Sequence, residues 1–295
     1  MGIDRFTARP CGEAVAELGE GPRWDAEREE LLWVDILAGA LHRGVVEAEG
    51  VRRIGGVRID RHLGAAAPMV DGGWVVAAAT GFGLLAEDGT LVELAQPEAD
   101  AEGRTRMNDG ACDPQGRFWA GSMAYDEAPG AGTLYRLDGD GSVREMAGGA
   151  TVSNGLGWSP DGRTMYYSDS GTRTVDAFAF DPFAGAIADR RTILRYGPDE
   201  GACDGLAMDD EGCLWIGIWD GWRVERRAPD GSLLAVVDVA AARVTACCFV
   251  GRTLVITTAW TGLSDASRAR QPDAGRLFCA DVGVAGPPAV PYVRA

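Results

Sequence analysis

Pairs of short apolar runs joined by polar turns recur along the chain, and the pair between residues 203 and 221 shows the pattern clearly. Residues 206–208 form a first apolar run, the polar turn DDEG follows, and residues 213–219 form a second run. Two such runs around a glycine-containing turn predict a β-hairpin. An acidic residue, Asp204, precedes the first run, where a side chain can project from the end of a sheet.

The same hairpin pattern occurs about six times. The other copies lie at 18–44, 65–80, 108–123, 154–170 and 244–260. The landmark residues of the second runs are Trp33, Val75, Trp119, Tyr166, Trp215 and Val255, at spacings of 42, 44, 47, 49 and 40 residues. Strand-only repeats of this length are typical of propeller blades. We therefore predict an all-β fold, a six-bladed β-propeller with four-stranded antiparallel blades, as a single domain over residues 1–295.

Four of the repeats carry an oxygen-bearing side chain at nearly the same position relative to the landmark residue, which we call its phase. Glu20, Asn108, Asn154 and Asp204 lie 13, 11, 12 and 11 residues before their landmarks. In a ring of repeats, equal phase means equal height and equal distance from the axis. We therefore expect these side chains to converge at one mouth of the central channel. The second and sixth repeats offer little charge there, so one side of the site should be open.

Carboxylate and amide oxygens without Cys or His suit a hard divalent cation, with Ca²⁺, Mg²⁺ or Mn²⁺ leading. Three protein ligands leave coordination positions for water and substrate. The alternative is ordinary turn chemistry, because Asn-Gly and Asp-Gly are favoured turn pairs. Arg106 lies two residues before Asn108, so both side chains should face the same side of a strand. Asp109 precedes Gly110 just as Asp204 precedes Gly205, so it could be an outer ligand, but a turn cap is the favoured interpretation.

Composition excludes several classes of function. The net charge of −16 makes nucleic acid an unsuitable partner, and no apolar run is long enough for a membrane span or a signal peptide. Seven cysteines without a CxxC motif indicate neither a disulfide framework nor a zinc site, and reduced thiols predict a cytoplasmic protein. His42 and His62 lie in no ligand-spaced motif, and Ser153 and Ser168 have no paired histidine for a catalytic triad.

Four segments also resemble a known family. They are LGEGPRW, RMNDGACDPQGRFWAGSM, SNGLGWSPDGRTMYYSDS and CDGLAMDDEGCLWIG, and they resemble the gluconolactonases, senescence marker protein (regucalcin) and the sugar-acid lactonases over nearly the whole chain. The resemblance implies a six-bladed propeller that holds one divalent metal through Glu20, Asn154 and Asp204. The family uses Ca²⁺, Zn²⁺, Mn²⁺ or Fe²⁺, and Ca²⁺ is the first expectation here.

The resemblance also implies the remaining roles in the site. Arg106, Asn108 and Asp126 would contact substrate, and Asp126 stands where the family usually has Glu. Asp204 would be the acid/base residue. The expected activity is metal-dependent hydrolysis of a gluconolactone-like sugar lactone to the aldonic acid, by a monomer or weak homo-oligomer without nucleic-acid or membrane partners. The alternatives are a non-catalytic, regucalcin-like Ca²⁺-binding regulator, a protein-binding scaffold, and phosphotriester hydrolysis on the same metal site.

Overall fold

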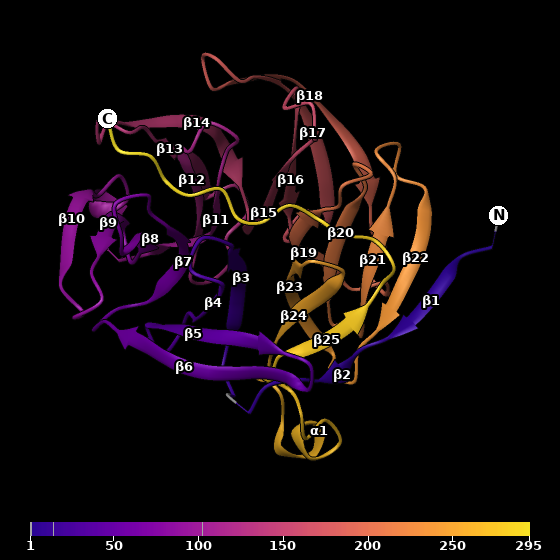
Figure 1. Ribbon diagram of the computed structural model, residues 1–295. Helices are drawn as coiled ribbons and strands as arrows, with labels where there is room; N and C mark the ends of the chain where they lie inside the picture. Colours follow the sequence, from indigo (N-terminus) through magenta and orange to yellow (C-terminus); the bar gives the residue numbers. More distant parts are fainter. Residues whose placement is uncertain (1, 14, 102) are drawn as a thin grey trace.

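A computed structural model describes residues 2–13, 15–101 and 103–295 and shows six antiparallel blades around a central axis (Figure 1). Blade one contains β3 (Gly19–Asp25), β4 (Glu30–Asp35), β5 (Ala40–Glu47) and β6 (Gly50–Arg58). Blade two contains β7 (Leu63–Pro68), β8 (Trp74–Ala78), β9 (Gly81–Leu85) and β10 (Leu91–Ala95). Blade three follows the short 3₁₀ helix Ala99–Ala101 and contains β11 (Thr105–Cys112), β12 (Phe118–Ala124), β13 (Gly132–Leu137) and β14 (Val143–Ala150). Blade four contains β15 (Ser153–Trp158), β16 (Thr164–Asp169), β17 (Thr174–Asp181) and β18 (Ala186–Arg195). The predicted six-bladed propeller is therefore confirmed.

Two N-terminal strands add to the last two blades. Blade five contains β19 (Ala202–Met208), β20 (Leu214–Trp219), β21 (Arg223–Arg227) and β22 (Leu233–Asp238), and β1 (Asp4–Thr7) pairs in parallel with β22. Blade six contains β23 (Arg243–Val250), β24 (Thr253–Ala259), β25 (Phe278–Asp281) and the N-terminal strand β2 (Arg9–Pro10), which pairs with β25. Pairing the first residues with the last blade closes the ring and covers backbone groups that an open edge would leave unpaired.

A disulfide fastens this closure. Cys11, next to β2, is bonded to Cys279 in β25 across a sequence separation of 268 residues. The expectation that the cysteines are all reduced is therefore wrong for this pair, because the pairing of β2 with β25 brings together two residues from opposite ends of the chain. The other five cysteines are free and buried. The predicted cytoplasmic location depended on reduced thiols, so this pair gives it no support.

The core lies between the blades, and the landmark residues form part of it. Each landmark falls on the second strand of its blade, and all six are buried: Trp33, Val75, Trp119, Tyr166, Trp215 and Val255. Alternate residues of a strand face opposite sides of a sheet, so a blade packed on both faces buries nearly all of its second strand. This is why these runs are almost continuously apolar.

Buried aspartates tie two of the landmark tryptophans to the preceding turn. Asp113 accepts the indole N–H of Trp119 at 3.0 Å, and Asp209 accepts that of Trp215 at 2.9 Å. Each carboxylate also accepts backbone N–H groups of its own turn. The aspartate that begins each of these turns thus connects the turn to the tryptophan in the core of its blade.

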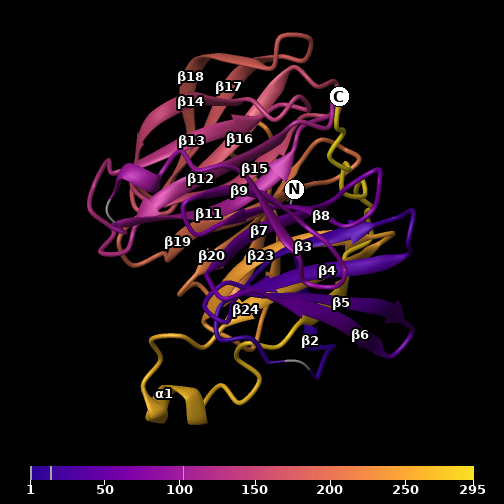
Figure 2. The same cartoon turned by 90° about the vertical axis from the view of Figure 1, so that its left-hand side faces the viewer.

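The two faces of the disc differ. The short helix α1 (Asp265–Ala269) and the C-terminal segment lie on opposite faces (Figure 2). The innermost strand β3 begins on the α1 face, where the Trp260 N–H donates to Glu17 O at 3.1 Å, and ends on the other face, where the Ala289 N–H donates to Trp24 O at 2.9 Å. Within the described residues, no helix is long and apolar enough to cross a membrane.

Candidate metal centre

All six innermost strands change register with their neighbours at an equivalent point near their start. In β19 the pairing with β20 slips by one residue between Cys203 and Leu206, where Asp204 lies. Equivalent slips occur in β3, β7, β11, β15 and β23. A bulge of this kind re-aims a side chain out of the regular alternation. The slips fall at or beside the four predicted ring positions: Glu20, Asn108, Asn154 and Asp204.

Glycines after two of these residues let neighbouring innermost strands approach closely. A Cβ on Gly155 would lie 2.5 Å from Leu206 N, and one on Gly205 would lie 2.4 Å from the Ala246 Cβ. No side chain can be accommodated at either distance. The bulges of blades four, five and six are therefore packed against one another, and this places Asn154 beside Asp204.

The Asn154 side chain has a fixed orientation. Its Nδ2 donates to Ser170 Oγ at 2.9 Å, and Ser170 Oγ donates in turn to Cys203 O at 2.6 Å. Asn154 Oδ1 and Asp204 Oδ1 are both buried and have no hydrogen-bond partner among the described residues. A buried acceptor without a partner costs about 1–3 kcal/mol. Two such acceptors on neighbouring bulges favour a positively charged ligand.

Electrostatics point to the same ligand. Burial, reinforced by the Asp109 carboxylate, raises the pKa of Glu20 to about 8, against the opposing effect of Arg23 and Arg106. Burial, together with the charges of Glu20 and Asp109, also raises the pKa of Asp204 well above its usual range. Three carboxyl groups are thus buried close enough to repel one another, and a bound cation would relieve that repulsion.

The donor set of Glu20, Asn154 and Asp204 fits a divalent metal ion. Two carboxylates and one amide oxygen are the ligands that hard cations prefer, and two of the three present an unpartnered buried oxygen. Across residues 2–13, 15–101 and 103–295, no group of three or more His, Cys, Asp and Glu side chains is arranged to hold a metal. A metal at this site therefore depends on the Asn154 amide, and on water or substrate to complete its coordination.

Arg106 and Asn108 lie together at the same mouth, as their two-residue spacing predicts. Arg106 Nη1 donates to Asn108 Oδ1 at 2.6 Å, and Asn108 Nδ2 donates to Ser153 O at 2.8 Å. Both side chains are buried. Burial lowers the pKa of Arg106, and the nearby carboxylates of Glu20 and Asp204 oppose that effect. The guanidinium is therefore held next to the predicted metal ligands.

Asp126 lies apart from this group. It is exposed in the loop between β12 and β13, where its Oδ1 accepts the Ala128 N–H at 3.1 Å. The neighbouring Glu127 and Tyr125 are among the groups whose charge raises the pKa of Arg106. In this structure Glu127 is therefore the carboxylate of the loop that acts on Arg106, and the predicted substrate contact at Asp126 stays a prediction.

A polar cavity of about 440 Å³ opens beside these residues, between blades one and two. Its lining includes Arg58, Arg61, His62 and Tyr125. His62 Nδ1 lies 3.1 Å from Tyr125 Oη, and Arg106 is one of the charges that lower the pKa of His62. Arg106 does not line this cavity, and it is related to it through His62 and Tyr125, which do.

The sequence left the role of Asp109 open between an outer ligand and a turn cap, and it gave no role to Arg23. Asp109 lies within strand β11, at its register slip and not in a turn, and its Oδ1 accepts the Gly110 N–H at 2.7 Å. It is buried and acts on both Glu20 and Asp204. Arg23 Nη2 lies 3.4 Å from Asp109 Oδ1. The sequence signal for Asp109 was the Asp-Gly pair that it forms with Gly110, as Asp204 does with Gly205, and nothing in the sequence joins Arg23 to it.

The alternative catalytic groups form no serine–histidine pair in the described part of the chain. His42 stacks on Trp33 with ring centroids 5.2 Å apart and accepts from Arg53. Ser153 Oγ accepts the Tyr167 hydroxyl at 2.7 Å. In the described part of the chain, neither Ser153 nor Ser168 is hydrogen-bonded to a histidine. A serine–histidine mechanism therefore has no support.

Comparisons with known proteins agree with this architecture. The family described as "SMP-30/Gluconolactonase/LRE-like region" matches residues 18–260. Regucalcin of Danio rerio is 37% identical over 284 residues, covering 94% of this chain and 95% of that protein. A Bacillus subtilis (strain 168) protein, whose name provisionally assigns it as a sugar lactone lactonase, is 34% identical over 282 residues, covering 94% and 95%. The crystal structure of "a calcium-binding protein, regucalcin" from Agrobacterium tumefaciens superposes with a TM-score of 0.91 at 26% identity, covering 100% of both chains.

Proposed function

Because the chain belongs to the SMP-30/gluconolactonase/LRE-like family, we propose that it hydrolyses a sugar-derived lactone to the aldonic acid with one bound divalent cation. The family supports lactone hydrolysis as the class of reaction. The observation that carries the proposal for this chain is the pair of unpartnered buried oxygens, Asn154 Oδ1 and Asp204 Oδ1, beside the buried carboxyl group of Glu20. The folded protein keeps these oxygens without a partner at a cost, and a cation-dependent reaction gives them a use.

Glu20, Asn154 and Asp204 would hold the cation. When bound, a divalent cation polarises a carbonyl oxygen and lowers the pKa of water. Ca²⁺ is the first candidate, because the ligands are all oxygens and the Agrobacterium relative is described as calcium-binding. Zn²⁺, Mn²⁺ and Fe²⁺ are the alternatives.

Asp204 is the group proposed to move the proton. As water attacks the lactone carbonyl carbon, the Asp204 carboxylate takes one proton from that water. The bond between the carbonyl carbon and the ring oxygen then breaks, and the same carboxyl group returns the proton to the leaving oxygen. A positioned acid/base of this kind contributes about 10²–10⁴-fold to the rate.

Arg106 and Asn108 are proposed to orient the hydroxyl groups of the sugar. Both are buried and hydrogen-bonded to each other, so their donors are fixed in position before substrate arrives. The polar cavity beside them has room for the part of the sugar that does not react. Asp126 is proposed as a further contact that its loop would bring toward the substrate.

The test is a panel of sugar lactones assayed after chelation and after return of Ca²⁺, Zn²⁺, Mn²⁺ or Fe²⁺ separately. We expect hydrolysis that disappears with chelator, returns with one or more cations, and is lost in Asp204→Asn. Asp220→Asn is the matched control, because Asp220 is an exposed carboxylate in the turn between β20 and β21. Wild-type rates in purified Asp204→Asn would refute the mechanism.

A second function is favoured by a specific observation. Several similar proteins carry the name regucalcin, and one solved relative is described as a calcium-binding protein. A non-catalytic Ca²⁺-binding regulator would bind the cation through the same three residues and hydrolyse no lactone on the panel. A cytoplasmic location and a monomeric or weakly associated state complete the proposal, and gel filtration with light scattering tests the second.

A further inference from the structure

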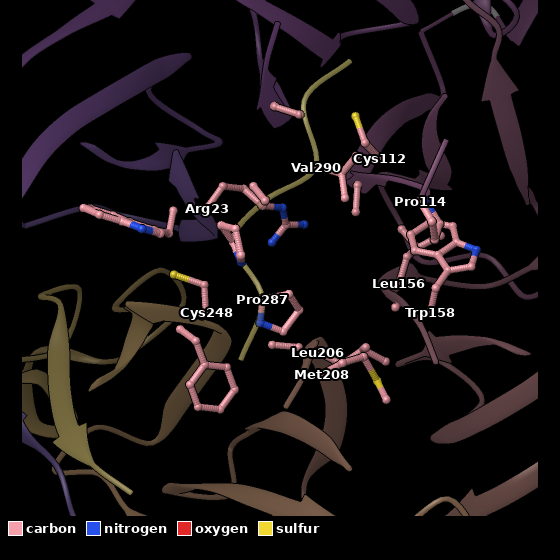
Figure 3. Close-up of a pocket in the computed structure, with 18 of the residues that line it drawn as sticks. Arg23, Cys112, Pro114, Leu156, Trp158, Leu206, Met208, Cys248, Pro287 and Val290 are labelled. Atoms are coloured by element: carbon pink, nitrogen blue, oxygen red, sulfur yellow. The ribbon is translucent and has the colours of Figure 1, made fainter. Parts of the chain in front are cut away.

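The channel has a second mouth, on the face opposite α1, and it contains a cavity of about 300 Å³ (Figure 3). The ends of the innermost strands supply its walls. Their large side chains there are mostly apolar: Trp24, Leu156, Trp158, Leu206, Met208 and Phe249. A cavity of this size holds on the order of ten non-hydrogen atoms, at roughly 30 Å³ for each water-sized group. Its lining contrasts with the polar cavity at the α1 face.

The C-terminal segment forms the roof of this cavity. Residues 287–290 line it, and Figure 3 shows Pro287 and Val290 on the segment that runs across the opening. The segment is attached on both sides, because the Asp210 N–H donates to Ala285 O at 2.9 Å and the Tyr292 N–H donates to Pro68 O at 2.8 Å. Between these points, the Ala289 N–H bonds to Trp24 O. A small molecule can therefore be enclosed between the strand ends and this segment.

Arg23 is the one charged side chain in the lining, and its guanidinium lies near the middle of the view in Figure 3. A guanidinium has five N–H groups. Nη1 donates to Pro22 O at 2.9 Å, and Nη2 donates to Gly110 O at 2.8 Å and contacts Asp109 Oδ1 at 3.4 Å. The Nε–H is buried without a partner in the described ranges, and Nη1 retains a second N–H. The buried Nε is out of reach of the open space, so the second N–H of Nη1 is the group of Arg23 that can donate to an oxygen acceptor in the cavity.

The charge of Arg23 is already balanced. Asp109 lies within 3.4 Å of it, so a second anion in the cavity would be buried beside a carboxylate, and a cation beside the guanidinium. Either would lose its hydration without a free counter-charge, which is costly in an apolar site. A sugar would lose most of its hydrogen bonds in this lining. The cavity favours a molecule that is neutral, mainly apolar and equipped with one acceptor oxygen.

We propose that this cavity is a second binding site, separate from the metal centre, for a small neutral ligand with an apolar body and one carbonyl-type oxygen that accepts from Arg23. The apolar walls bind the body of the ligand, and the C-terminal segment covers it. The site does not depend on the proposed hydrolysis, since none of its lining residues is a predicted metal ligand.

The probe is 4-phenyl-2-butanone, which has eleven non-hydrogen atoms and one carbonyl oxygen. Its matched charged comparators are 3-phenylpropionate and 3-phenylpropylamine. Binding is measured by ligand-observed NMR titration and by tryptophan fluorescence, on protein with and without divalent cation. We expect saturable one-to-one binding of the ketone below 10 mM in both forms, and binding of each charged comparator at least tenfold weaker.

Substitutions at three lining residues locate the ligand. Ala207→Leu, which fills space in the lining, should weaken ketone binding at least tenfold, and the exposed-site control Ala48→Leu should leave it unchanged. Ala111→Leu, from blade three, repeats the test if Ala207→Leu is unstable. Arg23→Met should weaken binding about tenfold, with partial recovery in Arg23→Lys.

Four results would overturn the proposal. They are an absence of saturable binding up to 10 mM, equal or tighter binding of a charged comparator, unchanged binding in the folded filling variants, and binding that requires the divalent cation. The last result would place the ketone at the α1 mouth. Loss of lactone hydrolysis with retained ketone binding would count against the proposed function alone.

Discussion

Without the proposed cation, the stability of this protein should depend on pH in an unusual direction. The pKa of Glu20 is raised from its ordinary 4.5 to about 8 in the folded chain. Between these values the folded state keeps a proton that the unfolded state has lost. Stability then falls as pH rises, and it falls until the folded carboxyl group ionises. Each pH unit within that range costs about 1.4 kcal/mol per group.

The informative window runs from pH 6.5 to pH 8. Below it, His42 and His62 also titrate, and their lowered pKa values act in the opposite direction. Above it, the unfolded thiols begin to ionise near their ordinary value of 9, while burial raises the pKa of Cys247 in the folded chain. Within the window, Glu20 alone should lower the free energy of unfolding by about 2 kcal/mol. Asp204 shifts in the same direction and adds to the fall.

The assay is urea unfolding of the chelated protein at several pH values, followed by the fluorescence of its nine tryptophans. Glu20→Gln should make the fall smaller, because the neutral amide does not titrate, and the contribution of Asp204 remains. Adding a cation that binds should reverse the trend, and about 2.7 kcal/mol is gained at a concentration 100 times its dissociation constant. A chelated wild type whose stability is level or rises from pH 6.5 to 8 would show that these carboxyl groups are not buried together, and the metal centre would then fail.

Three further outcomes are expected. Asp204→Asn should lower kcat for lactone hydrolysis by about 10²-fold or more and weaken cation binding in calorimetry; retention of both would contradict its double role. Arg106→Met should raise KM by about tenfold with a smaller change in kcat, measured by steady-state kinetics, whereas a change in kcat alone would show that Arg106 does not bind the ground state. Cys279→Ser should lower the free energy of unfolding by about 2–5 kcal/mol, because it removes the bond to Cys11 that closes the ring. Reductant should bring the wild type to the same value in urea unfolding. No change in either case would show that the disulfide does not stabilise the ring.

The fold was predictable because its signal is repeated. Each of the landmarks, from Trp33 to Val255, lies on the second strand of a blade. Their regular spacing along the chain indicates the number of blades even where one repeat has a weak pattern. The closure of the ring was not predictable. The strand β2 contains only Arg9 and Pro10, too few residues for any alternation of apolar and polar positions. Its pairing with β25, and with it the disulfide, depends on the geometry of the whole ring.

The site was predictable to the extent that it follows the repeat. Equal phase placed Glu20, Asn154 and Asp204 on equivalent bulges. The exposed position of Asp126 was not predictable, because it lies in a loop with a length and course of its own. The burial of Asp109 against Arg23 was missed for a related reason: the two residues come from different blades, and only the closed ring brings them within 3.4 Å.

The bulges also explain how the fold can hold such a cluster. Three buried carboxyl groups and two unpartnered acceptor oxygens are each unfavourable, and independent side chains would move apart or reach solvent. Here the ring residues are set by the backbone of strands whose neighbours are too close for even a Cβ at Gly155 or Gly205. The apolar packing between blades therefore bears the cost of a site that is arranged before any ligand arrives. Preorganisation of this kind is what a cation-dependent reaction requires, since donors already in place need no rearrangement at the moment of reaction.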